Sequence, residues 1–115
     1  MNDRELLELA AKAYSDPTIH AGLQGFTRTL GYDEELGCDY CVSWNPLIED
    51  GDALRLAVKL NLEIQIDFNE ESAKVYVDGS WPGSIVEEEL GELDRYQATR
   101  RAIVRAAAEI GRTMP

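Results

Sequence analysis

The sequence predicts an α+β fold in which an antiparallel β-sheet packs with three helices in an α/β/α sandwich-like arrangement. Leu62–Phe68 and Ala73–Val77 alternate apolar and polar residues with a period of two, which is typical of half-buried strands joined in a hairpin. Three other segments repeat apolar residues at helical spacing. Together with weaker strand signals, these patterns predict the order helix, two strands, helix, three strands, helix.

Length and composition predict one domain covering residues 1–115. The chain has 115 residues, of which 44% are hydrophobic and 29% charged, so it can bury a core of ordinary size. No run reaches the roughly 18 apolar residues of a membrane span, and the amino terminus lacks the basic and apolar regions of a signal peptide. We therefore expect a cytoplasmic protein with no membrane association.

The first helix is predicted at Asp3–Ser15. Asn2 can cap it, because Glu5 follows at capping-box spacing, and Pro17 disfavours a longer helix. The next segment is difficult to interpret, since four glycines interrupt residues 18–37 and leave only a short irregular strand at Leu23–Leu30. Cys38–Trp44 is a better strand, closed by Asn45-Pro46.

The second helix is predicted at Asp52–Leu60, with Asp52 as its amino-terminal cap. Its apolar residues cover roughly 200° of the helical circumference, which predicts burial from two sides. Ser84–Leu90 resembles an edge strand because it carries three consecutive glutamates. A last helix is predicted from Asp94 to Ile110, with Gly111 ending it in a left-handed conformation.

The charge distribution argues against nucleic acid and for a protein partner. The chain has 22 acidic and 11 basic residues, and residues 61–94 contain ten acids but a single base. Binding through phosphates needs a basic surface, which only the last helix offers. An acidic surface suits a basic protein partner, or it serves solubility alone. Homo-oligomerisation through the exposed sheet face or edge is a further alternative.

Three acids before the second helix, Glu49, Asp50 and Asp52, could bind a metal or act as acid and base. No histidine stands near them, so capping and solvation are the simpler interpretation. Cys38 and Cys41 are too few ligands to define a structural zinc site, and on a strand they point to opposite faces. We predict no cofactor and no catalytic residue, and for His20, the single histidine, a structural or surface role.

Trp44 and Trp81 each adjoin a proline-containing loop. Tryptophan is favoured at binding hot spots, but large aromatic side chains more often anchor such loops to the core. Both remain candidate binding residues, with core anchoring preferred.

Arg100 lies on the apolar face of the last helix, among Tyr96, Ile103 and Val104. A guanidinium there must reach past the core or find acceptors, because it cannot lose its proton. We expect it to meet an acid from the sheet or from Glu49–Asp52. The alternative is an anion site for a ligand carboxylate or phosphate.

Two segments resemble the phage ABA sandwich domain family: Trp44–Leu60 (WNPLIEDGDALRLAVKL) and Arg100–Gly111 (RRAIVRAAAEIG). The resemblance covers most of the chain after Trp44. It implies a sheet with helices on both faces, whereas the alternation of the hairpin favours one open face. It also implies a phage or prophage protein in a bacterial host, and it brings no catalytic motif.

We therefore expect a small phage accessory protein, a non-enzymatic module that binds a host or phage protein through acidic and aromatic surface. Glu87, Glu88 and Glu89 are an obvious part of that surface. The alternative is a small-molecule or metal-dependent enzyme that uses Glu49, Asp50 and Asp52.

Overall fold

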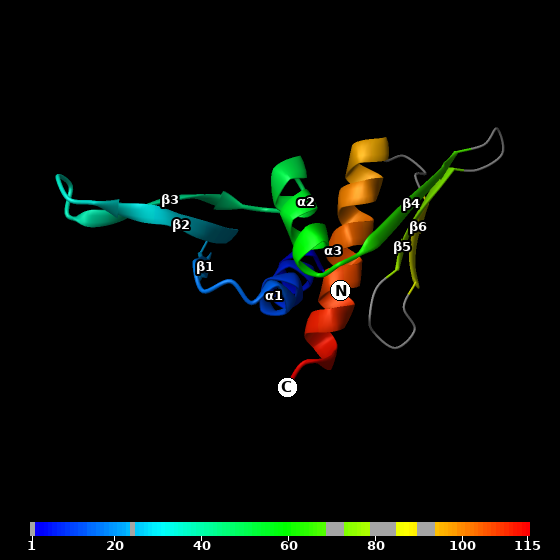
Figure 1. The fold of residues 1–115 in the computed structure, drawn as a ribbon, viewed down its shortest axis with the longest axis horizontal. Helices are drawn as coiled ribbons and strands as arrows, with labels where there is room; N and C mark the ends of the chain where they lie inside the picture. Colours follow the sequence, from blue (N-terminus) through cyan, green and yellow to red (C-terminus); the bar gives the residue numbers. More distant parts are fainter. Residues whose placement is uncertain (1, 24, 69–72, 79–84, 90–93) are drawn as a thin grey trace.

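The computed structural model describes residues 2–23, 25–68, 73–78, 85–89 and 94–115 (Figure 1). These residues form an α+β fold with three helices and two antiparallel sheets. The helices are α1 (Asp3–Tyr14), α2 (Asp50–Lys59) and α3 (Arg95–Thr113). The strands are β1 (Ile19–Gly22), β2 (Gly25–Asp33), β3 (Cys38–Trp44), β4 (Glu63–Phe68), β5 (Ala73–Asp78) and β6 (Ile85–Glu89).

The helices stand between the two sheets, so the prediction of a single sheet was wrong. One sheet has the order β1-β2-β3 and the other β4-β5-β6, and no described strand joins them. Figure 1 shows the first sheet projecting away from the helices, while the second lies along α3. In the first sheet, β3 has the predicted bounds Cys38–Trp44, and β2 overlaps the short irregular strand predicted at Leu23–Leu30. Strand β1 was not predicted, because glycines interrupt this segment and most of the sheet has no buried face to impose an alternation.

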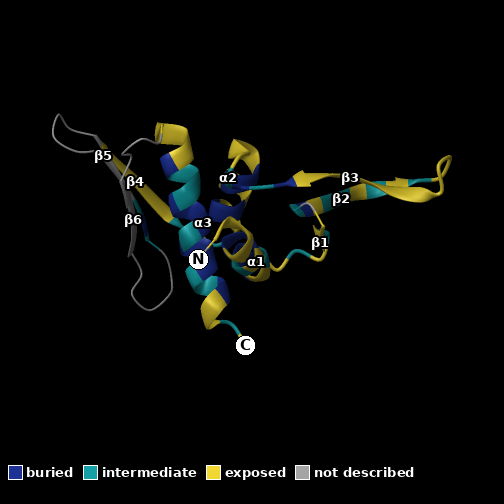
Figure 2. Cartoon of the chain, turned by 180° about the vertical axis from the view of Figure 1, so that it is seen from behind, coloured by how far each residue is buried: buried dark blue, intermediate teal, exposed yellow. Residues whose placement is uncertain are grey.

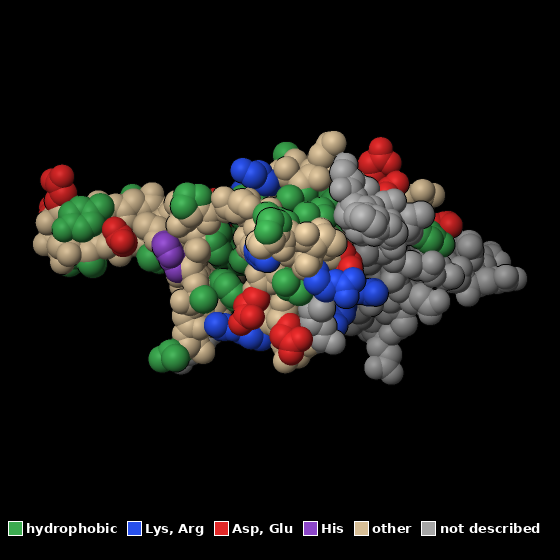
Figure 3. Space-filling view, turned by 90° about the horizontal axis from the view of Figure 1, so that it is seen from below, with side chains coloured by type: hydrophobic (Ala, Val, Ile, Leu, Met, Phe, Trp, Pro, Cys, Tyr) green, Lys and Arg blue, Asp and Glu red, His purple; other side chains and the backbone are tan. Residues whose placement is uncertain are grey.

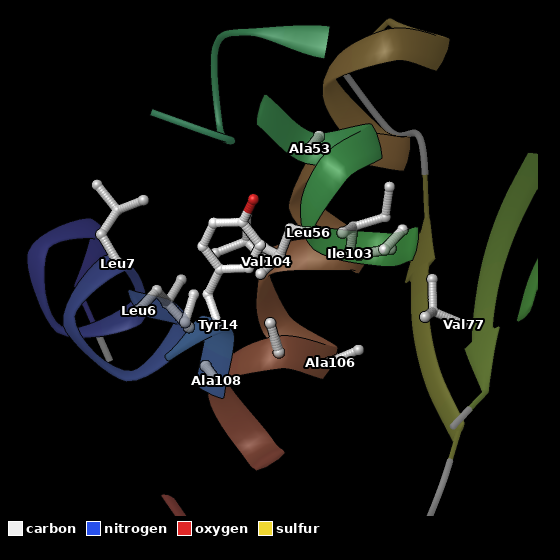
Figure 4. Packing of buried hydrophobic residues seen from close by; sticks show 14 of the residues in the cluster. Leu6, Leu7, Tyr14, Ala53, Leu56, Val77, Ile103, Val104, Ala106 and Ala108 are labelled. Atoms are coloured by element: carbon white, nitrogen blue, oxygen red, sulfur yellow. The ribbon is translucent and has the colours of Figure 1, made fainter. Parts of the chain in front are cut away.

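Helices α1 and α3 form the centre of the core. Asn2 caps α1 as predicted, its side chain accepting a hydrogen bond from the Glu5 amide at 2.8 Å. Asp94 caps α3 in the same way through the Gln97 amide. The two helices meet largely through alanines, while Leu6, Leu7, Leu56 and Val104 add larger side chains to the cluster (Figure 4). No described helix is both long and apolar enough to cross a membrane.

Gly111 lies inside α3 and does not end it, which corrects the prediction of a left-handed cap. The helix continues to Thr113, and a Cβ atom on Gly111 would come within 2.0 Å of the Leu9 carbonyl oxygen. The glycine is therefore needed for the close approach of α1 to α3. The only clue in the sequence was its place after a run of alanines.

The second sheet confirms the predicted hairpin of β4 and β5, although Ile64 and Ile66, on the inward face of β4, are 37% and 48% exposed. Ile64 pairs with Val77, and the buried Val77 belongs to the core. Glu63 and Gln65 lie exposed on the opposite face, where Tyr76 and Asp78 are partly covered. One face of this sheet is therefore directed toward the helices and the other toward solvent. As predicted, β6 is an edge strand.

Helix α2 is less covered than its apolar arc predicted. Ala53, Leu56 and Ala57 are buried, but Leu54 is 61% exposed and Val58 is 72% exposed. The helix begins at Asp50, two residues before the predicted start, and Asp52 is not its cap. Burial from two sides was wrong because the second sheet contacts α3 mainly through β5 and β6 and leaves the outer side of α2 open.

Candidate functional site

Two surfaces of the described chain leave large apolar side chains in solvent. The first is the part of the β2–β3 hairpin beyond the Phe26–Trp44 pair, residues 27–43, which we call the arm. The second is a groove between α2, α3 and β4, which we call the Arg100 groove. Figure 2 shows β3 exposed along the arm and β2 with exposed and intermediate residues, in contrast to the buried sides of the helices.

The arm is anchored at its base by an aromatic cluster. The Trp44 ring stacks on Tyr14 of α1 with ring centroids 6.0 Å apart, and Phe26 meets Trp44 edge to face at the same distance. The Arg4 guanidinium covers Phe26 at 5.0 Å and donates to the Gly22 carbonyl. Trp44 is only 1% exposed, so it anchors the chain to the core, as preferred, and offers no surface to a partner.

The arm meets the rest of the described chain only near its base, where β1 pairs with Thr27 and Arg28 and α2 faces Arg28, Val42 and Ser43. Its exposed apolar side chains are Leu30, Tyr32, Leu36, Tyr40 and Val42. The same stretch carries the acids Asp33, Glu34, Glu35 and Asp39, and no lysine or arginine occurs between residues 29 and 43. Figure 3 shows hydrophobic and acidic side chains together toward the end of the arm. The arm is therefore an acidic, apolar projection.

The arm has its own local packing. Tyr40 lies opposite Gly31 in the register, and a Cβ atom on Gly31 would come within 2.7 Å of the Tyr40 hydroxyl. An aromatic ring over a strand glycine covers backbone that would otherwise be bare. The register shifts by one residue between Thr29 and Gly31, a bulge that increases the local twist. Such packing is modest, because a hairpin in water is marginally stable by itself.

The Arg100 groove has a volume of about 390 Å³ and an apolar floor. Its lining residues come from α2, β4 and α3: Asp50, Ala53, Leu54, Ile64, Ile66, Arg95, Tyr96, Thr99, Arg100 and Ile103. Ile66 is 48% exposed and Tyr96 is 69% exposed. The groove thus presents apolar side chains to solvent between two helices and an edge strand.

Arg100 makes the ion pair predicted from the sequence. Its Nη1 donates to the Asp50 carboxylate at 2.7 Å, and its Nε donates to the Leu47 carbonyl at 2.9 Å. The Arg100 side chain is 14% exposed, whereas that of Asp50 is 70% exposed. Arg100 therefore fixes the loop before α2 to α3 while forming part of the groove wall.

The three acids of the proposed metal or acid-base cluster do not converge. Asp50 faces Arg100, while Asp52 is buried and accepts from the Asn45 amide at 3.0 Å and from Arg55 at 2.7 Å. Glu49 precedes the helix without a capping hydrogen bond. Among the residues the structure describes, no three potential metal ligands of the His, Cys, Asp or Glu type come together.

A second hollow of about 320 Å³ lies between the base of the arm and α2, and no residue of it except Glu49 and Asp52 had been singled out. Arg28 and Arg55 face it together with these acids. The Nε atom of Arg28 is buried and has no hydrogen-bond partner among the described residues. One feature of the sequence could have identified Arg28 as a candidate: it is the only lysine or arginine between residues 13 and 54.

The remaining candidates are dispersed. Cys38 and Cys41 are free and exposed, on opposite faces of β3 as predicted, with Cys41 Sγ 3.6 Å from the Thr29 hydroxyl. His20 is exposed on β1, which agrees with a surface role. Trp81 lies outside the described residues, as do the side chains of Glu87, Glu88 and Glu89.

No protein-family model matches this chain, and no curated protein or solved structure matches it significantly. The resemblance to the phage ABA sandwich domain family therefore stays a prediction. The structure itself shows an α+β fold with an exposed arm and an open groove.

Proposed function

We propose that this chain is a non-enzymatic protein-binding module, of the phage or prophage accessory type, that holds its partner by the arm. One observation carries the proposal: the arm projects from the described body and, beyond its base, holds five large apolar side chains in solvent. Large exposed apolar surface on a protein marks an interaction site, because it gains free energy when a partner covers it.

The charge of the arm indicates the chemistry of the partner. Four acids and no bases between residues 29 and 43 favour a protein whose recess is apolar and rimmed with lysine or arginine. Opposite charges speed the encounter, while Tyr32, Leu36 and Tyr40 supply area that desolvates on binding. A polyanion such as DNA would be repelled by the same surface.

A photo-crosslinking residue at position 36, in place of Leu36, tests this assignment in extracts of bacterial cells. The matched control carries it at position 23, in place of Leu23, which is exposed as Leu36 is but lies outside the arm. We expect a crosslinked protein with a basic surface from position 36 only. Crosslinks of equal yield from both positions would contradict the proposal.

A variant with a shortened arm provides a second test. Replacing residues 30–40 by Asn-Gly joins Thr29 to Cys41, which are already opposite each other, through a two-residue turn. Partner capture should be lost, whereas Leu23→Ser should leave it intact. Retention of the same partner by the shortened protein would overturn the role of the arm.

A further inference from the structure

We propose that the free edge of β4 and the Arg100 groove together accept an extended segment of another protein as an additional strand, with apolar residues facing the groove and basic residues facing outward. This surface is separate from the arm, and the inference does not depend on what the arm binds. Three features of the described residues carry it.

The first feature is an open strand edge. In the order β4-β5-β6, β4 pairs only with β5, so the backbone N–H and C=O groups of its other edge lie outside any ladder of the described strands. Exposed edges template further strands unless proline, lysine or a bulge blunts them. The sequence of β4, EIQIDF, has neither proline nor lysine, and its register with β5 is regular.

The second feature is the groove beside that edge. A strand added to β4 continues the sheet over the space between β4 and the helices, so its inward side chains enter the groove. There they meet Ile66 of β4, Leu54 of α2 and Tyr96 of α3, all about half exposed or more. The volume of about 390 Å³ falls in the range typical of ligand pockets, about 300–1,000 Å³.

The third feature is the charge of the outer face. Glu63 and Asp67 are exposed there, and Glu63 lies opposite Asp78 on β5, a like-charged pair. Opposite charges on directly opposed strand residues stabilise a pair, and like charges destabilise it. An incoming strand with lysine or arginine at its outward positions therefore fits β4 better than a neutral or acidic one.

The same argument disfavours a second copy of this chain as the added strand. Antiparallel pairing of two β4 strands about Gln65 would place Glu63 of each copy opposite Asp67 of the other. The segment is therefore expected to come from a different protein, with apolar and basic residues in alternation. This is strand addition with side-chain pockets, a recurring mode of peptide recognition.

The probe is a synthetic peptide, Lys-Ile-Arg-Val-Lys-Ile-Arg-Val, added to the isotope-labelled full chain. We expect amide shift changes and slowed hydrogen exchange in Glu63–Phe68. A peptide of the same composition with the charges in one block should bind about tenfold more weakly, as should one with glutamate at the basic positions. Equal binding of the blocked peptide, or shift changes confined to the arm, would overturn the proposal.

Two N-methylated peptides test the backbone contact. In a strand, alternate amides point to the same side, so methylating one alternate set removes the hydrogen bonds to β4 and methylating the other set leaves them. Only one of the two peptides should lose binding. If both lose it equally, or neither does, then the peptide is not held as a strand.

Protein variants locate the side-chain contact. Leu54→Gln should weaken the peptide by about tenfold, while Val58→Gln should not change its affinity, since Val58 is a similarly exposed residue one turn away that does not line the groove. Equal effects of the two variants would contradict entry into the groove. Light scattering that shows a dimer with β4 protected before peptide is added would assign the edge to a second copy and refute the proposal.

Discussion

Gly111 sets how closely α1 and α3 approach, because the space for its side chain is occupied by the Leu9 carbonyl. Gly51 is also a helical glycine, but a Cβ atom there would meet only the end of the Arg55 side chain, at 3.4 Å. Glycine therefore has different effects at the two positions: packing requires it at Gly111, whereas at Gly51 it only weakens the helix.

We predict that Gly111→Ala lowers the free energy of unfolding by about 3 kcal/mol or more, because helix backbone must move. Gly51→Ala should leave it unchanged or raise it by about 0.5–1 kcal/mol. Urea unfolding of the two variants checks both signs. If Gly111→Ala were no more destabilising than Gly51→Ala, the two helices would not be in contact at Gly111.

Arg100 holds the Leu47 carbonyl and packs its stem against the groove wall, so Arg100→Ala should destabilise the fold by about 1–3 kcal/mol. Its acid partner, Asp50, is exposed, and for that reason the loss is smaller than for a buried ion pair. Arg112→Ala, which breaks an exposed pair with Glu109, should cost well under 1 kcal/mol. Equal melting temperatures would show that Arg100 stands in solvent.

Asp16 lies between α1 and β1, where the Thr18 hydroxyl and then the Thr18 amide donate to its carboxylate and lower its pKa. Its pKa is thus lower in the folded than in the unfolded chain, where it is about 3.9. The stability it contributes is present above that value and is lost as the pH falls through the folded-state pKa.

We therefore predict that Thr18→Ala raises the pKa of Asp16 and reduces the fall in stability on acidification. Carboxyl NMR titration, with urea unfolding at pH 3 to 7, measures both; Thr27→Ala, at an exposed strand position, is the control. An unchanged Asp16 titration in Thr18→Ala would show that the turn does not hold the carboxylate.

At the scale of elements, the helices and the second sheet were predictable because each buries one face and therefore carries a periodic pattern. Of the arm, β3 was predicted with its bounds, but the full length of β2 and its pairing with β3 were not, since exposed strands need no alternation and glycines obscured β1 and β2. Asp52 looked like a cap because caps are local, but its actual partners, Asn45 and Arg55, depend on how the loop folds back.

That Arg100 pairs with an acid from the sheet or from Glu49–Asp52 could be predicted, because a largely covered guanidinium requires an acceptor; which acid it meets, Asp50, could not. The groove beside it could not. Its existence depends on β4 standing away from α2, and the sequence of α2 alone indicated burial on that side. Periodicity reports that a face is apolar, but it does not report whether another element covers that face.

The arm contributes little to folding beyond its aromatic base. None of residues 30–40 belongs to the core cluster, whereas Phe26 and Trp44 do. Replacing residues 30–40 by Asn-Gly should therefore change the free energy of unfolding by no more than about 1 kcal/mol. Trp44→Ala should cost about 3–5 kcal/mol, because it removes a buried ring that contacts Tyr14 and Phe26.

Thermal and urea unfolding of these two variants compare the tip of the arm with its base. A shortened protein that unfolds as easily as Trp44→Ala would mean that the arm folds back on the body and is part of the core.

At the scale of the whole molecule, the arm makes the chain longer than a compact domain. The radius of gyration of the Cα atoms is 15.3 Å and the longest dimension is 56 Å. A compact chain of this length has a radius of gyration of about 13 Å. The arm, which projects to one side of the helices, contributes to this difference together with the second sheet, which extends to the other side (Figure 1).

Small-angle X-ray scattering of the wild-type protein and of the shortened-arm variant tests directly whether the arm stands free in solution. We predict that the wild-type protein is a monomer whose longest dimension is near the 56 Å of the structure, and that shortening the arm brings the radius of gyration down toward about 13 Å. Equal radii for the two proteins, at a compact value, would show that the arm is folded against the body and would contradict its role as a binding surface.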